Sequence, residues 1–185
     1  TRSDRDWSSD VSLPILERQQ LAAGEKDLTA ISVELKTLGE QVINGVKLSL
    51  TVEELLKNSG IGTTIYALKP GDGSAREQAA SCQKVLGGWA NIAKEYATKR
   101  YRSNLINWGM LPFTFAGSAD TFAVDSLIFV PNLKQKLIAK EQKIPAWVIN
   151  DGAAKEIELE LAALTDDETE IILKGSLINY YSAAK

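Results

Sequence analysis

Residues 71–77 are the stretch of this sequence whose residue types and spacing best suit chemistry on a charged ligand. They read Gly-Asp-Gly-Ser-Ala-Arg-Glu and join an apolar stretch to an amphipathic one. The N–H groups at the start of a helix have no partner inside the helix and attract anions. Glycine lets the backbone approach a ligand closely, and the guanidinium of Arg76 matches a carboxylate in shape and charge. We therefore expect a carboxylate or phosphate site made by the backbone of Gly73 and Ala75 and the side chain of Arg76.

Ser74 has two interpretations on spacing alone. Ser74-x-x-Glu77 has the form of a capping box, in which the serine does no more than cap a helix. Beside helix-start N–H groups and a guanidinium, the same hydroxyl is also plausible as a general base, because these groups stabilise its alkoxide. Gln78 and Ala79 stand where a dinucleotide fingerprint would need its third glycine, and no Gly-Lys-Ser/Thr ending of a phosphate-binding loop is present.

The composition excludes several classes of site. The 185 residues include no histidine, which removes a Ser-His-Asp triad and the usual zinc sites. The single cysteine, Cys82, excludes an intrachain disulfide and is consistent with a reducing, cytoplasmic compartment. Its place within an expected helix predicts burial. A net charge of -3 gives no support to a nucleic-acid partner, and no apolar run approaches the roughly 20 residues that a membrane span needs.

Alternating strands and helices are expected to position the 71–77 turn. In chain order the hydrophobic pattern predicts strand 63–68, helix 74–86, strand 89–96, helix 99–108 and strand 110–115. Glycines at 87, 88 and 109 end the two helices. Strands that alternate with helices imply an α/β fold.

Further elements flank this core. Apolar runs and alternation predict strands at 126–130, 147–149 and 157–161, and Thr165-x-x-Glu168 predicts a capped last helix. Upstream, Asn44-Gly45 favours a turn followed by a strand, and a short capped helix over 51–57 is expected to end at Gly60 and Gly62. No element is assigned to residues 1–27.

Three blocks resemble the aconitase superfamily. Residues 71–80, Gly-Asp-Gly-Ser-Ala-Arg-Glu-Gln-Ala-Ala, are similar to its Gly-x-Gly-Ser-Ser-Arg-Glu-His-Ala-Ala signature. Residues 99–113 resemble its Arg-x-Asn-Leu-Ile-Asn-x-Gly-(apolar)-Leu-Pro-(apolar) stretch, and residues 175–180 resemble its closing Gly-Gly-Leu-Leu-Asn-Tyr. The motifs are specific across 71–115 and looser near the end of the chain.

The resemblance implies a swivelling β/β/α domain of the aconitase C-terminal (isopropylmalate dehydratase small-subunit) type. Residues 1–185 would form one such domain, with 1–60 an N-terminal extension or insert. By position in the signature, Ser74 corresponds to the catalytic base and Arg76 to the arginine that binds a substrate carboxylate. Arg102 is a further candidate for substrate binding, with a solvated helix face as its alternative.

The resemblance also implies a [4Fe-4S] cluster, whose open iron acts as a Lewis acid on the departing hydroxyl. A cluster with one open iron needs at least three cysteine thiolates, and this chain has only Cys82. We therefore expect the cluster to be held by other domains of the polypeptide or by a partner chain. The isolated chain is expected to show no hydratase activity.

The function expected from the resemblance is that of a hydro-lyase domain acting on a hydroxylated di- or tricarboxylic acid. Ala75 replaces the second signature serine and Gln78 replaces the histidine, so the choice of acid stays open. Because the sequence begins at Thr1 rather than Met, a piece of a longer polypeptide is favoured. The alternatives are a separate small subunit of a 3-isopropylmalate-dehydratase-like enzyme and a non-catalytic anion-binding module.

Overall fold

The computed structural model describes residues 59–124, 126–150 and 153–182, together with the backbone of three short strands. These strands are β1 (Ser9–Ser12), β2 (Val42–Ile43) and β3 (Val46–Lys47). β2 and β3 pair antiparallel on either side of the predicted Asn44-Gly45 turn, which itself lies outside the described residues. The predicted helix at 51–57 also lies outside them.

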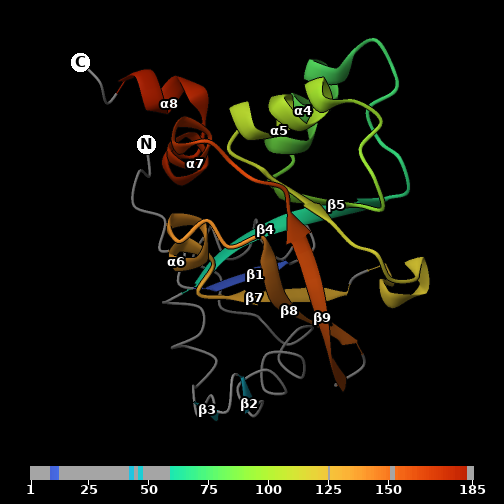
Figure 1. Cartoon of the computed structure of the whole chain (residues 1–185). Helices are drawn as coiled ribbons and strands as arrows, with labels where there is room; N and C mark the ends of the chain where they lie inside the picture. Colours follow the sequence, from blue (N-terminus) through green and yellow to red (C-terminus); the bar gives the residue numbers. More distant parts are fainter. Residues whose placement is uncertain are drawn as a thin grey trace, which may run out of the picture.

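The strands of the main sheet close into a barrel in the order β1-β4-β5-β6-β9-β8-β7 (Figure 1). Their bounds are β4 (Ser59–Ala67), β5 (Gly88–Ala93), β6 (Leu111–Thr114), β7 (Leu127–Pro131), β8 (Lys143–Asn150) and β9 (Ala153–Leu161). β1, β4, β5 and β6 run parallel, whereas β7, β8 and β9 pair antiparallel with their neighbours. β1 pairs with both β4 and β7 and so completes the ring.

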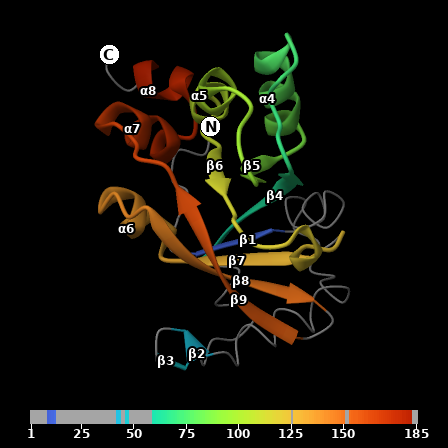
Figure 2. The ribbon, with the colours of Figure 1, turned by 45° about the vertical axis from the view of Figure 1, so that its right-hand side comes forward.

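Helices connect the parallel strands and gather at one side of the barrel. α4 (Arg76–Val85) joins β4 to β5, and α5 (Lys99–Asn107) joins β5 to β6. The remaining helices are η1 (Ala119–Thr121), α6 (Leu133–Ile138), α7 (Asp166–Lys174) and α8 (Leu177–Ser182). In both ribbon views α4, α5, α7 and α8 lie on one side of the barrel, while the β8–β9 hairpin points away from them (Figure 2). None of the helices in the described ranges is long and apolar enough to span a membrane.

The alternating pattern of β9 shows how the barrel interior is filled. Ile157, Leu159 and Leu161 are buried, while the glutamates between them face solvent. This is the period of two that a strand with one buried face requires. A second, smaller cluster lies between the helices, where Tyr101 is buried with its neighbours Ala80, Leu105 and Met110. The α/β class predicted from the sequence is confirmed.

The prediction that Gly60 and Gly62 end a helix is wrong, because both lie within β4. The backbone at residue 62 passes so close to β5 that a Cβ there would lie 2.3 Å from Cγ of Trp89. The glycine therefore permits a close approach of two strands rather than the end of a helix. The helices α6 and α8 were not predicted, since six residues are too few to show a helical period.

The prediction that Cys82 is buried is also wrong, because its side chain is exposed on α4. Only Ala80 is buried in this helix. Residues two apart on a helix point to nearly opposite sides, so Cys82 faces solvent where Ala80 faces the protein.

Candidate functional site

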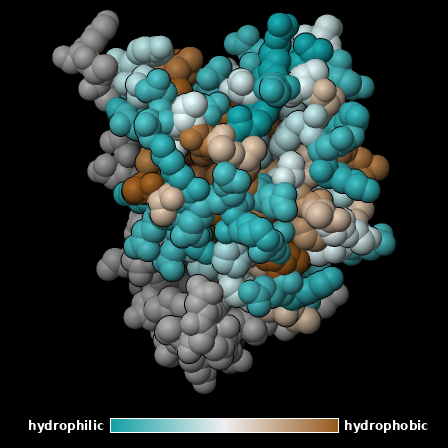
Figure 3. All heavy atoms as spheres, in the orientation of Figure 1, coloured by the Kyte–Doolittle hydropathy of each residue, from teal (hydrophilic) through white to brown (hydrophobic). Residues whose placement is uncertain are grey.

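The connection from β4 to α4 carries the predicted anion site. This connection runs alongside α4 and leads into the start of the helix, which is the end of α4 farthest from the barrel (Figures 1 and 2). Residues 72–75 are exposed, and Gly71 and Arg76 are half-buried. The space-filling view shows a mostly hydrophilic surface over α4 and α5 (Figure 3). The predicted site residues therefore lie on an open surface.

Ser74 does not cap α4, so the predicted capping box is wrong. The N-cap is Ala75, whose side chain has no polar atom, and the first helical bond runs from the N–H of Ala79 to its carbonyl at 3.0 Å. Backbone dihedrals of φ −90° and ψ 44° at Ala75 place Ser74 one residue outside the helix. The N–H groups of the first turn consequently have no side-chain cap and remain suited to an external anion.

Arg76 folds back over the turn that precedes it. Its Nε donates to the carbonyl oxygen of Gly71 at 2.9 Å, and its Nη2 lies 3.4 Å from the carbonyl oxygen of Asp72. Within the described part of the chain, Nη1 donates no hydrogen bond. One edge of the guanidinium is thus occupied by the protein, and the Nη1 side is left for a ligand.

Gly71 and Gly73 occupy the turn for different reasons. Gly71 has φ +93°, and a Cβ there would lie 2.4 Å from Cβ of Tyr101. A Cβ on Gly73 would meet nothing within 4 Å. Gly71 is therefore required by the backbone and by packing, whereas Gly73 borders open space in front of the turn.

Thr98 and Tyr101 support the turn from α5, and sequence reasoning missed both. Thr98 caps α5, where its Oγ1 accepts from the N–H of Tyr101 at 3.2 Å and donates to the carbonyl oxygen of Gly71 at 3.2 Å. The buried Tyr101 hydroxyl accepts hydrogen bonds from Gln83 at 3.0 Å and from Asn91 at 3.2 Å. A threonine directly before a predicted helix signals a cap, but no local signal indicates that its hydroxyl reaches Gly71.

Tyr96 packs against the small buried cluster that contains Tyr101. Its hydroxyl is 3.1 Å from the carbonyl oxygen of Asn91 and 3.0 Å from that of Phe113. Burial raises the pKa of the Tyr96 phenol well above its usual value, the nearby Tyr101 adds to the rise, and Arg102 opposes it. The Tyr96 hydroxyl thus lies within hydrogen-bond distance of the backbone of both β5 and β6.

Comparison with known proteins assigns the segment that contains this turn to a family. Residues 50–118 match the family model of the aconitase C-terminal domain. The chain carries an aconitase C-terminal domain. The match covers the strand–turn–helix unit described above, so the resemblance that the sequence predicted is confirmed.

Several aconitate hydratases are similar to this domain. Aconitate hydratase A of Rickettsia bellii is 30% identical over 137 residues, which is 67% of this chain and 14% of that protein. The mitochondrial aconitate hydratase of Gracilaria gracilis is 34% identical over 110 residues, covering 59% of this chain and 14% of that protein. The chain therefore spans about one seventh of the length of these relatives.

Arg102 makes its hydrogen bonds and ion pair with the connection between β9 and α7 and with the start of α7. Its Nη2 donates to the carbonyl oxygens of Ala162 and Ala163 at 3.2 Å each, and its Nη1 lies 3.5 Å from Oε1 of Glu168. The side chain is only 18% exposed. The structure brings Gly73, Ser74 and Arg76 together in one turn and ties Arg102 to the connection between β9 and α7.

The residues present in this aconitase C-terminal domain do not fit an iron–sulfur cluster. The full sequence has one cysteine and no histidine. Over the ranges that the structure describes, no three or more Cys, His, Asp or Glu side chains converge as metal ligands. A cluster needs several thiolates at one point, which a single exposed cysteine on α4 does not provide.

Proposed function

We propose that this chain is the substrate-binding and catalytic-base domain of an aconitase-type hydro-lyase that acts on a hydroxylated di- or tricarboxylic acid. The observation that carries the proposal is the uncapped start of α4, which lies in the open with Arg76 folded beside it. Membership of the aconitase C-terminal domain family and the similarity to aconitate hydratases support the choice of reaction.

In this proposal a substrate carboxylate binds Nη1 of Arg76 and the N–H groups at the start of α4. The backbone of Gly73 and Ala75 forms the floor of the site, where open space in front of Gly73 admits the ligand. Ser74, as its alkoxide, removes the proton from the carbon next to the carboxylate. The helix-start N–H groups and the guanidinium stabilise that alkoxide electrostatically.

We further propose that the [4Fe-4S] cluster reaches this domain from elsewhere, on cluster-bearing domains of the same polypeptide or on a large subunit. The proposal is supported by the single cysteine of this chain, which is too few to bind such a cluster. Because the chain spans only 14% of its relatives, the remaining length of such a protein has ample room for cluster-bearing domains.

The role of Ser74 is tested by Ser74→Ala in the protein assembled with its cluster-bearing part. Because a general base contributes about 100-fold to 10,000-fold to rate, we expect kcat to fall by at least about 100-fold while KM stays within about twofold. The measurement is the steady-state dehydration rate with citrate and, separately, with 3-isopropylmalate.

Ser81→Ala is the matched control, because the Ser81 hydroxyl donates to the carbonyl oxygen of Gln78 on the same helix. This variant is expected to keep the parent rate. A parent-like rate for Ser74→Ala would show that Ser74 is not the base. Binding of citrate without turnover in the assembled protein would favour the non-catalytic anion-binding alternative.

A further inference from the structure

The carbonyl oxygen of Gly71 is an acceptor shared by two elements. Arg76, at the start of α4, donates to it through Nε at 2.9 Å, and Thr98, at the cap of α5, donates to it through Oγ1 at 3.2 Å. Thr98 and Gly71 are 27 positions apart in the sequence. The direction of this one carbonyl therefore depends on α5, and the direction of the guanidinium depends on the carbonyl.

Thr98, the α5 partner of the Gly71 carbonyl, is itself fixed by several hydrogen bonds. The Thr98 hydroxyl uses its single proton on Gly71 and accepts the N–H of Tyr101, so both its donor and an acceptor site are engaged. Tyr101 is 2% exposed, and its hydroxyl is bound by Gln83 on α4 and Asn91 on β5. The N–H of Ala97 also binds the carbonyl of Pro70 at 3.0 Å, next to the shared acceptor.

Apart from its bond to Gly71, the Arg76 side chain makes one other hydrogen bond within the described residues. Its second bond, from Nη2 to the carbonyl of Asp72, is long at 3.4 Å and lies on an exposed loop. An arginine side chain has several rotatable bonds, and ordering it costs conformational entropy unless a firm partner directs it. The Nε–Gly71 bond is the shorter of the two and sets the plane of the guanidinium.

We propose that Thr98 is a positioning residue for Arg76, acting through the Gly71 carbonyl so that Nη1 faces the ligand side of the turn. The functional meaning of that direction rests on the carboxylate-binding role proposed above for Arg76. Thr98 itself does not touch the ligand; it orients the acceptor that orients the guanidinium. Pre-orienting a charged donor in this way lowers the ordering cost when a carboxylate binds.

The test compares Thr98→Val, which keeps the branched shape and loses the hydroxyl, with Thr98→Ser, which keeps the hydroxyl. The first readout is the water-exchange rate of the Arg76 Nε–H in the full 185-residue chain, followed by NMR and assigned through its absence in Arg76→Lys. The second is the dissociation constant for citrate.

In Thr98→Val we expect the exchange of the Arg76 Nε–H to speed up and citrate binding to weaken, each by about tenfold, which corresponds to about 1.4 kcal/mol. Thr98→Ser is expected to stay within about twofold of the parent on both.

Thr165→Val is the matched control, because Thr165 caps α7 as Thr98 caps α5. This variant loses a helix cap of the same kind and is expected to leave Arg76 exchange unchanged. Parent-like Arg76 exchange in Thr98→Val, or equally fast exchange in Thr165→Val, would overturn the proposal. Faster exchange in Thr98→Val with no citrate binding even in the parent chain would support the positioning role and contradict the carboxylate-binding function instead.

Discussion

The chemistry that we propose rests on a few residues of one turn, and the two glycines of that turn have different surroundings. Gly71 combines φ +93° with a close approach to Tyr101, whereas Gly73 has free space where its Cβ would be. Nothing in the described packing requires glycine at position 73. The open space in front of it is consistent with a ligand that approaches the backbone closely.

This difference predicts opposite outcomes for two matched variants. Gly71→Ala is expected to lower the free energy of unfolding by about 2 kcal/mol or more, because a strained φ and a steric clash add together. Gly73→Ala is expected to stay within about 0.5 kcal/mol of the parent but to weaken citrate binding by about tenfold. Urea unfolding measures the stability of both variants, and a citrate titration measures their affinity. Similar losses of stability in the two variants would contradict the different roles assigned to Gly71 and Gly73.

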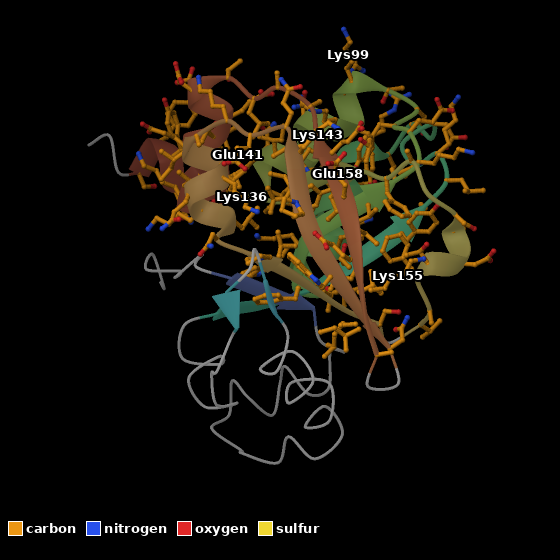
Figure 4. The ribbon with its side chains drawn as sticks, turned by 60° about the horizontal axis from the view of Figure 1, so that its bottom comes forward. Lys99, Lys136, Glu141, Lys143, Lys155 and Glu158 are labelled. Atoms are coloured by element: carbon orange, nitrogen blue, oxygen red, sulfur yellow. The ribbon has the colours of Figure 1, made fainter. Side chains whose placement is uncertain are left out.

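At the scale of elements, polar side chains join the helices and strands of this domain to one another and to their connections. Arg102 joins α5 to the β9–α7 connection, and the Thr165–Glu168 capping box begins α7. On the barrel, Lys143 of β8 and Glu158 of β9 point toward one another across the hairpin, with Nζ and Oε1 2.9 Å apart (Figure 4). The exposed pair has little effect on stability, while the half-buried Arg102 contacts have more.

We expect Arg102→Ala to lower the free energy of unfolding by about 1–3 kcal/mol, because two backbone carbonyls and Glu168 lose a charged donor. Lys69→Ala removes the exposed pair with Glu95 and serves as the control, with no measurable change expected. Urea denaturation of both variants is the measurement. If Arg102→Ala kept parent stability and lost citrate binding, Arg102 would have to be reassigned as a ligand of the substrate.

At the scale of the whole molecule, this aconitase C-terminal domain is a closed barrel with a helical layer that carries the proposed site. The turn at 71–76 lies at the end of α4 farthest from the barrel, where it is open to a partner surface. The chain spans 14% of the aconitate hydratases that it resembles. The exposure of residues 72–75 and the single cysteine are the observations behind our proposal that other domains complete the reaction centre.

The purified 185-residue chain is therefore expected to show no dehydration of citrate, followed as the absorbance of the unsaturated product. An intact aconitase of known activity in the same assay is the control. Turnover by the chain free of any cluster-bearing protein would contradict the proposed division of the active site.

Local pattern was enough to predict the strands and helices of residues 63–115 and the cap at Thr165. Periodicity depends on residues only a few positions apart, so the sequence alone indicates it, and the same holds for the capping box at Thr165 but not for the one expected at Ser74. The 71–77 turn was recognisable for the same reason, since its glycines, Ser74 and Arg76 are consecutive or nearly so. The helices α6 and α8 were missed because six residues are too few to show a helical period, and the strand role of Gly62 was missed because it depends on the close approach of Trp89.

Only the tertiary structure decided what the side chains of the site do. Ser74 lies outside the helix cap, Arg76 turns back to Gly71, and Thr98 reaches the same carbonyl from 27 positions away. Arg102 binds carbonyls 60 and 61 positions further along. The long-range bonds of Thr98 and Arg102 form between segments that meet only after the helices pack on the barrel, and no local sequence pattern encodes which segments will meet.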